Sequence, residues 1–572
     1  MAGSKHIDKI CVVVLVFSLL LTVLFVNGER LGIEMIVDED AGANAGLVCF
    51  TANDLDGDWD ASNATRITLD GSGTAGGGAY FYNGDLVISG AGRYVLSGTL
   101  DGGSIIVNAD DSSKVWLLLD GVAVNCPDDA CLRVDEADKV FLTLAEGTVN
   151  SFTSGESYSE AALADNTGGA IFAHDDLTIN GSGSLNVTAG YKHGIDANDE
   201  LVITGGTISI SAPQDGVHVN DGFRFCAASL TVAAGDDGVH SDTSVYIESG
   251  TVRIDECYEG IEAPAIDIAG GEITIYPEDD GLNANGGSGN VFAGFDRFGG
   301  GRDFSRFDGD MPGGDFDTQT PRFSGTDGER PDTSGAPRFN GEVPGQSDIS
   351  GSNGERPSLP DMSGPGGEAL TLPGAGAPAG ADDAGQSPGE PYIRISGGTI
   401  TIVNENTRDA DGIDSNGSIY ITGGSIRISM ASGGYALDVG RESGGVMEIS
   451  GGDIIACGSY AMAEGFDPSS TQPSILYTCS AGAPAGITVA LEDLDGSVLI
   501  SYKAPCGFTC VNLSCPEMEL GETYRVVIGE DVEEITLSEV SASYGGAQSG
   551  GFGGVRPRDD FMGGGRGGRL GT

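Results

Sequence analysis

His193-Gly194-Ile195-Asp196 opens a series of four-residue motifs in which a glycine is followed by an apolar residue and then a polar one. The series continues with Asp215-Gly216-Val217-His218, Asp237-Gly238-Val239-His240, Glu259-Gly260-Ile261-Glu262, Asp280-Gly281-Leu282-Asn283 and Asp411-Gly412-Ile413-Asp414. The first four glycines are 22 residues apart (216 − 194, 238 − 216, 260 − 238), and the fifth follows after 21. A fixed period of this length is typical of a solenoid in which each repeat forms one turn.

The residues within one repeat indicate strands. Val217 and Val219 alternate with His218 and Asn220, which is typical of a strand with one buried face. Similar short alternating runs follow, separated by small pairs such as Gly205-Gly206. No stretch has apolar residues at the spacing of a helical repeat. An antiparallel sandwich, the alternative, would show uneven spacing and hairpin dipeptides. We therefore predict an all-β, right-handed parallel β-helix.

Stacked turns would bring equivalent residues about 4.8 Å apart, so the motif predicts ladders of side chains. The inward apolar ladder consists of Ile195, Val217, Val239, Ile261, Leu282 and Ile413. The outward ladder one position later consists of Asp196, His218, His240, Glu262, Asn283 and Asp414. A further ladder, directly before the glycines, consists of His193, Asp215, Asp237, Glu259, Asp280 and Asp411. The corner ladder consists of Asn198, Asn220, Asp242, Pro264, Asn285 and Asn416.

The acidic residues of these ladders predict a cation site. Two carboxylates ~5 Å apart at an effective dielectric constant of ~20 repel by about 3 kcal/mol. Clustered oxygen ligands suit Ca²⁺. The candidate ligands are Asp196, Asp215, Asp236, Asp237, Glu259, Asp279, Asp280, Asp411 and Asp414. The alternative is that Asp and Asn are ordinary corner residues, selected for local hydrogen bonds.

Composition excludes some functions. The formal charge is −57, from 28 basic and 85 acidic residues, which makes nucleic acid a poor partner. None of the 11 cysteines has zinc-ligand spacing, and disulfide pairs cannot be assigned from their positions. We expect a monomer.

The first 28 residues predict a secretory signal. Lys5 and Lys9 precede an apolar run from Cys11 to Val26, which is short for a membrane span. We expect the protein to be secreted or held at the cell surface, with a membrane contact only if this segment is not cleaved.

The remaining chain divides by pattern. The predicted segments are an acidic N-terminal region (29–80), the first part of the β-helix (81–285), a Gly/Pro/Asp-rich disordered insert (286–391), the second part of the β-helix (392–473), a β-rich cap (474–545) and a disordered Gly/Arg-rich tail (546–572). The strand pattern resumes at Ile393-Arg394-Ile395, where the second strand of the interrupted turn is expected. The insert therefore leaves from the corner after the Asn198 ladder. Two alternatives are open for the insert: its arginines neutralise part of the charge of the acidic ladders, or it is a surface loop without a function of its own.

Several of these features together resemble a known family. They are the Gly-Gly-x-Ile-x-Ile strands, Ala189–Ile195 leading into Asp199–Ile203, the acidic stretch Asn53–Asp58, and the cap from Ser474 to Gly529. The chain resembles secreted carbohydrate-binding proteins with a right-handed parallel β-helix, related in shape to calcium-dependent pectate lyases. The resemblance implies binding of cellulose or acidic pectin-like glycans with Ca²⁺ on the Asp-Gly corners. Glu259 and Pro264 depart from that pattern.

Three functions stay open. The first is non-catalytic polysaccharide binding, with Tyr191, Lys192, His218 and His240 as candidate sugar contacts. The second is a calcium-dependent polysaccharide lyase, for which Lys192 is the candidate base. The alternative for Lys192 is pairing with the acids nearby, which would spoil it as a base. The third is a cell-surface adhesin or structural protein.

Overall fold

A computed structural model describes residues 49–70, 76–285, 390–406, 410–431 and 433–546. The predicted signal segment, nearly all of the predicted insert and nearly all of the tail lie outside these residues. Among the described residues, no helix combines the length and apolar character needed to cross a bilayer.

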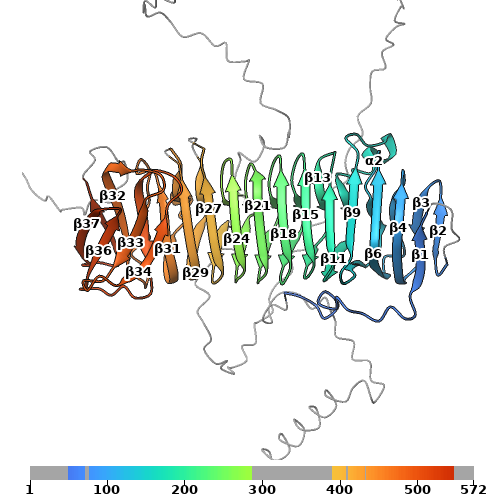
Figure 1. The fold of residues 1–572 in the computed structure, drawn as a ribbon, viewed down its shortest axis with the longest axis horizontal. Coiled ribbons are helices and arrows are strands. Elements are labelled where there is room, and N and C mark those ends of the chain that lie inside the picture. The colour runs from blue at the N-terminus through green and yellow to red at the C-terminus, as the bar shows by residue number, and fades with distance from the viewer. Residues whose placement is uncertain (1–48, 71–75, 286–389, 407–409, 432, 547–572) are drawn as a thin grey trace, which may run out of the picture. The chain divides into compact units, whose positions relative to one another are not determined.

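The described chain forms a parallel β-solenoid of about 11 turns, which confirms the predicted fold class (Figure 1). Each regular turn contributes one strand to each of three faces. The face that carries the glycine motif, which we call the motif face, consists of β3 (Asp85–Ile88), β5 (Ile105–Asn108), β7 (Leu132–Glu136), β10 (Gly169–Ala173), β13 (His193–Ala197), β16 (Val217–Val219), β19 (Val239–Ser241), β22 (Ile261–Glu262), β25 (Leu282–Ala284), β28 (Asp411–Ser415) and β30 (Tyr435–Val439).

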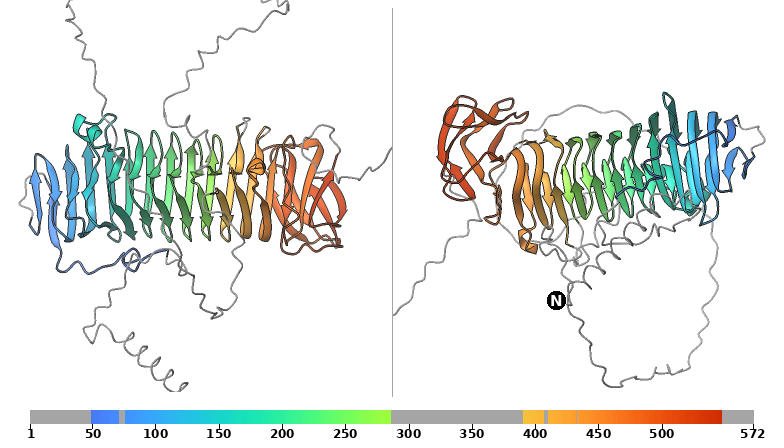
Figure 2. Two further views of the ribbon diagram at one scale, coloured as in Figure 1. Left: turned by 180° about the vertical axis from the view of Figure 1, so that it is seen from behind. Right: turned by 90° about the horizontal axis from the view of Figure 1, so that it is seen from below.

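The other two faces follow in each turn. The second face contains β1 (Thr65–Leu69), β8 (Lys139–Leu144), β11 (Asp176–Gly181), β14 (Leu201–Ile203), β17 (Gly222–Phe225), β20 (Ser244–Ile247), β23 (Ala265–Ile268) and β26 (Tyr392–Ile395). The third face contains β9 (Val149–Ser154), β12 (Ser184–Thr188), β15 (Thr207–Ala212), β18 (Ser229–Ala234), β21 (Thr251–Cys257), β24 (Glu272–Pro277) and β27 (Thr399–Asn404). Long strands that belong to both faces are β4 (Gly92–Asp101), β6 (Lys114–Cys126), β29 (Ser418–Met430) and β31 (Met447–Gly458). Figure 2 shows the turns stacked in sequence order from behind and from below.

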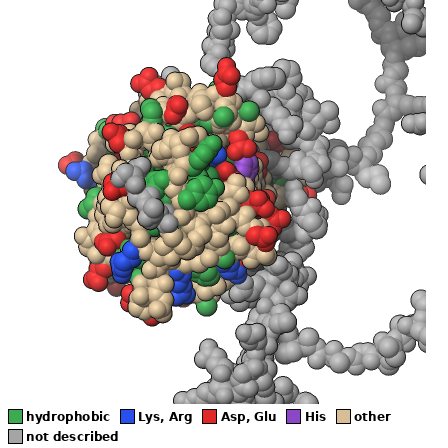
Figure 3. All heavy atoms as spheres, turned by 90° about the vertical axis from the view of Figure 1, so that its right-hand side faces the viewer, with side chains coloured by type: hydrophobic (Ala, Val, Ile, Leu, Met, Phe, Trp, Pro, Cys, Tyr) green, Lys and Arg blue, Asp and Glu red, His purple; other side chains and the backbone are tan. Residues whose placement is uncertain are grey.

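Few elements depart from this pattern. At the N-terminal end, β2 (Ala79–Tyr82) forms an antiparallel hairpin with β3. A five-residue helix, α2 (Glu160–Ala164), stands between β9 and β10, and a short 3₁₀ helix, η2 (Arg441–Ser443), stands between β30 and β31. The space-filling view of the N-terminal end shows hydrophobic side chains near its centre and acidic side chains around its rim (Figure 3).

The predicted inward ladder is the core of the motif face. Ile195 is paired with Val217, Val217 with Val239, and the register continues through every predicted member of that ladder. All of them are fully buried. The glycine of the motif is required by close stacking, because a Cβ on Gly216 would lie 2.7 Å from the carbonyl oxygen of Gly238 in the next turn. The period of 22 residues thus explains why the apolar residues stack on one another and why a glycine recurs before each of them.

The solenoid continues across the long gap between β25 and β26. β26 pairs in parallel with β23, and the amide of Tyr392 donates to the carbonyl of Pro264. Pro264 belongs to the predicted corner ladder. The described strands on either side of the gap therefore meet at the corner between the motif face and the second face.

Residues 49–60, which we call the strap, run across the second face (Figure 1). Asp54 is only 2 % exposed and its Oδ1 lies 3.1 Å from Nζ of Lys139 on β8. The hydroxyl of Thr178 on β11 donates to the same carboxylate at 2.6 Å. Burial would raise the pKa of Asp54, but Lys139 and these hydrogen bonds hold it below its ordinary value. The acidic stretch is thus a packing element.

The strap also explains apolar side chains on the outside of the second face. Phe50 packs with Val202 of β14, which is fully buried although it alternates with inward residues. At the other end of the strap, Nε1 of Trp59 donates to the hydroxyl of Thr143 at 2.9 Å. The second face is therefore covered on both sides where the strap crosses it.

The C-terminal region closes the stack. β32 (Ser474–Ala483) and β35 (Phe508–Ser514) pair antiparallel, and β35 also pairs antiparallel with β31 of the last turn. β38 (Ser541–Gly545) pairs parallel with β32. A separate four-stranded sheet consists of β33 (Thr488–Glu492), β34 (Val498–Lys503), β36 (Thr523–Ile528) and β37 (Asp531–Thr536). The change from parallel to antiparallel pairing covers the edge of β31 that a further turn would otherwise extend. No disulfide joins the ten cysteines of the described residues.

Candidate functional site

The polar ladders of the motif face form one continuous row on its outer side. The strand register places Asp196 beside His218, His218 beside His240, and so on through Glu262 and Asn283 to Asp414, as the period predicts. The residues before the glycines lie alongside, so side chains of two ladders contact each other between turns. We call this double row the polar row.

Histidines dominate the first part of the polar row. The rings of His193 and His218 stack with centroids 4.5 Å apart, and those of His218 and His240 stack at 5.0 Å with an interplanar angle of 5°. Oδ2 of Asp215 lies 3.0 Å from Nδ1 of His193 and 2.8 Å from Nδ1 of His218. Burial would raise the pKa of Asp215, but contacts with both histidines hold it well below its ordinary value. This carboxylate is therefore ionised at neutral pH.

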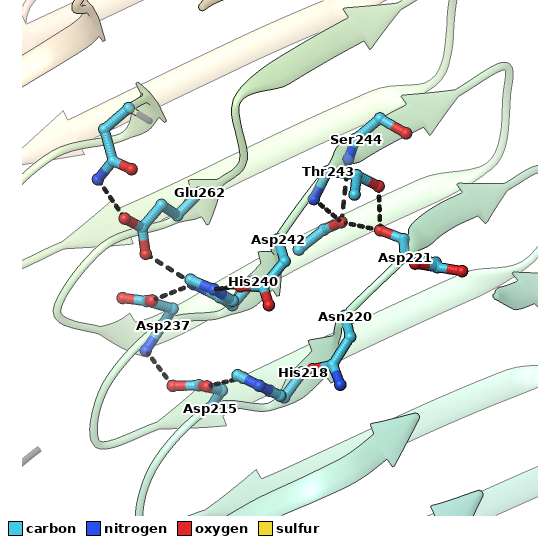
Figure 4. A network of polar contacts seen from close by, with 12 residues as sticks. Asp215, His218, Asn220, Asp221, Asp237, His240, Asp242, Thr243, Ser244 and Glu262 are labelled. Atoms are coloured by element: carbon cyan, nitrogen blue, oxygen red, sulfur yellow. Dashed lines mark hydrogen bonds and ion pairs between the residues drawn. The ribbon is translucent and has the colours of Figure 1, made fainter. Parts of the chain in front are cut away.

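The next group combines one histidine with three carboxylates (Figure 4). Nδ1 of His240 lies 3.2 Å from Asp237 and 2.7 Å from Glu262, and its Nε2 lies 3.3 Å from Asp242. Burial would lower the pKa of His240, but these contacts raise it to about 12. Burial raises the pKa of Asp237 well above its ordinary value, while His240 helps to hold that of Glu262 below. The positive charge of His240 therefore balances negative charge of the carboxylates around it.

Glu259 marks the point where the histidines end. Burial, with Glu262, Asp237 and Asp280 nearby, raises the pKa of Glu259 to about 10. Nδ2 of Asn283 donates to Oε2 of Glu259 at 2.8 Å. Glu259 is consequently protonated at neutral pH and adds no charge to the row.

The last part of the polar row is composed of carboxylates. Oxygens of Asp280, Asp411 and Asp414 lie within 4.8 Å of one another. The pKa of Asp414 is raised to about 7, first by burial and then by repulsion from nearby carboxylates that include Asp280 and Asp438. We call these three residues the carboxylate cluster.

The oxygen donors that Ca²⁺ prefers lie at the carboxylate cluster rather than in the histidine part. Asn283 is 6 % exposed and stands beside Asp414 in the ladder, and its buried Oδ1 has no hydrogen-bond partner. Three carboxylates and an amide oxygen are the oxygen donors that Ca²⁺ takes. The residues present therefore match the donor set of a calcium ion.

The remaining candidate calcium ligands are distributed differently. Asp196 is buried between the histidines, and burial raises its pKa. Asp236 is exposed and has an oxygen within 4.8 Å of Asp215 and Asp237. Asp279 is one of the carboxylates that raise the pKa of Asp414. The structure thus divides the predicted acidic edge into a part compensated by histidine and a part composed of carboxylates.

The candidate sugar contacts lie at the histidine end. Tyr191 packs on Tyr158 at a centroid distance of 4.8 Å, and Nζ of Lys192 lies 5.6 Å from the centre of the Tyr191 ring. Lys192 has a positive φ of 47°, which is uncommon outside glycine. The structure therefore brings Tyr191, Lys192, His193 and Asp196 to one corner, with His218 and His240 in the turns that follow.

A groove beside the strap is a feature that the sequence did not indicate. Its volume is about 870 Å³, and it is lined by residues of the strap and of the corner between the second and third faces, which include Asp56, Trp59, Glu146, Ser182 and Thr204. The acidic pattern of residues 54–60 was the available signal. The groove residues outside the strap, such as Glu146 and Thr204, are too distant in sequence for that acidic pattern to identify them.

Comparisons with known proteins found similarity to carbohydrate-binding proteins over part of the chain. Residues 83–288 match a family described as "Carbohydrate-binding domain-containing protein". A carbohydrate-binding domain-containing protein of Acetivibrio thermocellus is 36 % identical over 129 residues, which cover 22 % of this chain and 45 % of that protein. The chain thus spans less than half the length of this relative. The solved structure of a polysaccharide lyase-like protein from C. thermocellum, a gadolinium derivative, is 27 % identical with a TM-score of 0.32, covering 38 % of this chain and 85 % of that one.

Proposed function

We propose that this chain is a secreted, non-catalytic polysaccharide-binding protein that binds through the motif face of its solenoid. The observation that carries the proposal is the extent of the family match. Residues 83–288 run from the start of the first turn to β25 and include the histidine part of the polar row. The part of the chain similar to carbohydrate-binding proteins is therefore the part that carries the predicted sugar contacts.

Two of the candidate contacts suit an acidic glycan directly. The ring of Tyr191 offers an apolar surface against which a sugar ring packs. Lys192 places an ammonium beside that ring, where it attracts a uronate carboxylate. These neighbouring groups therefore match the apolar and the anionic part of one acidic sugar.

The two histidines have different roles in this proposal. Nδ1 of His218 faces Asp215, which leaves the Nε2 edge of the ring for a sugar hydroxyl. His240 has both ring nitrogens engaged by carboxylates. We therefore assign His240 to holding its neighbours in place rather than to sugar contact.

Calcium belongs to the carboxylate cluster in this proposal. Asp280, Asp411 and Asp414, with Oδ1 of Asn283, would hold the ion. A bound Ca²⁺ supplies positive charge that neutralises these carboxylates and attracts acidic sugar groups. The row then combines anion-attracting sites at Lys192 and at the calcium ion on a protein whose formal charge is −57.

The lyase alternative rests on Lys192. A lyase base must accept a proton, whereas the contact between Lys192 and the face of Tyr191 is one that a charged ammonium makes. The geometry therefore supports binding over β-elimination.

A glycan-binding screen tests the proposal. The full chain is applied to immobilised cellulose, polygalacturonate and neutral xylan in buffer with Ca²⁺ and in buffer with chelator. We expect binding to polygalacturonate in Ca²⁺ that falls at least tenfold with chelator and with Tyr191→Ala. Tyr460→Ala, which removes an exposed tyrosine outside the motif face, is the matched control and should change nothing.

Two outcomes would contradict the proposal. Binding to none of the polysaccharides would exclude the function itself. Release of unsaturated uronides from polygalacturonate, followed by ultraviolet absorbance and abolished by Lys192→Ala, would replace the binder with the lyase.

A further inference from the structure

The histidine part of the polar row holds donor atoms that calcium does not favour. The chain contains five histidines, and three of them stack in this one column. His193, Asp215 and His218 each offer one ligand atom, and these three atoms lie within 4.8 Å of one another. Ca²⁺ takes oxygen ligands, whereas imidazole nitrogen suits Zn²⁺ and its neighbours in the first transition series.

The distances suit a small tetrahedral ion. The carboxylate oxygen of Asp215 is 3.0 Å from the nitrogen of His193 and 2.8 Å from that of His218. Ligands of tetrahedral Zn²⁺, with bonds of about 2.0–2.1 Å, lie about 3.3 Å apart. Small side-chain shifts are therefore enough to admit the ion.

Nδ1 of His193 contacts Asp215 but makes no hydrogen bond of good geometry. The atom is enclosed by protein and lies 3.0 Å from Oδ2 of Asp215. A metal ion at the centre of the three atoms would satisfy it. The carboxylate of Asp215 is thus approached by the ring nitrogens of both His193 and His218.

The carboxylate of Asp215 is held in the orientation that such a site requires. The backbone amide of Asp237 donates to Oδ1 at 3.2 Å, so Oδ2 is the oxygen that faces the histidines. Hydrogen bonds that fix the second atom of a ligand are typical of protein metal sites. The same carboxylate therefore has one oxygen fixed by the next turn and one directed at both rings.

We propose that His193, Asp215 and His218 form a binding site for a divalent transition-metal ion of the Zn²⁺ class, separate from the carboxylate cluster. The three protein ligands leave one position of a tetrahedral ion for water or a ligand oxygen. The site joins three ligands from two adjacent turns, so the bound ion links β13 to β16.

Calorimetric titration with Zn²⁺ tests the site. The full chain, without a polyhistidine tag, is stripped with chelator, dialysed, saturated with Ca²⁺ and titrated, and its metal content is measured by mass spectrometry. We expect one tightly bound zinc per chain in the presence of excess Ca²⁺. His193→Gln and His218→Gln should each weaken binding at least tenfold. His174→Gln is the matched control, because His174 contacts Asn198 and Asp165 outside the site.

A spectroscopic measurement on the unmodified chain is independent of how the variants fold. Co²⁺ in place of Zn²⁺ should produce the intense visible absorption of a tetrahedral nitrogen and oxygen site, and added Zn²⁺ should remove it. The proposal is overturned if this absorption is missing, or if the His193→Gln/His218→Gln double variant binds zinc as tightly as the unmodified chain. It is also overturned if Asp414→Asn, rather than the histidine variants, abolishes zinc binding.

Discussion

Replacing Asp414 with asparagine should stabilise this protein when calcium is absent. Asp414 lies in the polar row between Asn283 and Asp438 of the adjacent turns. Its carboxylate is buried beside other carboxylates, and its pKa is raised from 3.8 to about 7. Ionising Asp414 therefore costs free energy in the folded state. Asparagine has nearly the same shape and cannot ionise, so it removes this cost.

The magnitude follows from the shift in pKa. Each pKa unit corresponds to 1.36 kcal/mol, so a rise from 3.8 to about 7 corresponds to about 4 kcal/mol. Because the folded pKa lies above the unfolded one, the stability linked to proton binding is fully present below pH 3.8 and is lost as the pH rises through about 7. By pH 8 the loss is complete. Calcium bound at the proposed site would offset this loss.

Thermal unfolding followed by circular dichroism measures the effect. In chelator at pH 8, Asp414→Asn should melt above the unmodified chain, and near pH 4 the difference should disappear. In excess Ca²⁺ at pH 8 the order should reverse, because the variant lacks a ligand of the proposed calcium site. Asp120→Asn, at an exposed position on the solenoid, is the control and should follow the unmodified chain throughout. A variant that melts below the unmodified chain in chelator at pH 8 would refute the reasoning.

Three further predictions concern packing. Asp54→Ala should lower the free energy of unfolding by about 3 kcal/mol in a denaturant titration, because the buried Lys139 loses the nearer of its two counter-ions and keeps only Asp176 at 3.8 Å; a loss below 1 kcal/mol would show that the strap contributes little. Gly216→Ala should abolish soluble expression, since its Cβ would lie 2.7 Å from the carbonyl oxygen of the next turn, whereas Gly222→Ala, with no contact under 3.4 Å, should express normally. Ile261→Ala should cost about 2–5 kcal/mol in the same titration, because the core ladder cannot close around the cavity, and equal denaturation midpoints would contradict that packing.

The stacking of the motif face was predictable because it depends on local pattern. A constant period and an alternating apolar residue determine which residue pairs with which, so the ladder from Ile195 to Ile413 could be predicted across a gap of more than a hundred residues. The division of the polar row into a histidine part and a carboxylate part could not be predicted from the sequence. It depends on contacts between different ladders, such as Asp215 with His193 and His218, and these depend on side-chain rotamers and burial rather than on spacing.

The strap was not predictable for a related reason. The pattern around Asp54 indicates only an acidic turn, and its partners carry no complementary motif. The weak signal was on the partners' side, in the unbroken apolar runs around Phe141 and Val202. Such runs indicate strands covered on both faces, but they do not identify the segment that covers them.

The strap also has a consequence for the order of folding. Trp59 bonds to a residue 84 positions later, and Cys49 to one 175 positions later. A segment synthesised before the solenoid therefore has no surface to bind until the turns from β8 to β17 have stacked. Each new turn of the solenoid needs contacts only with the turn before it. The strap can bind only after several turns of the second face have formed. We expect the strap to be the last part of the described chain to acquire its native contacts, and refolding to end with a slow phase reported by the fluorescence of Trp59.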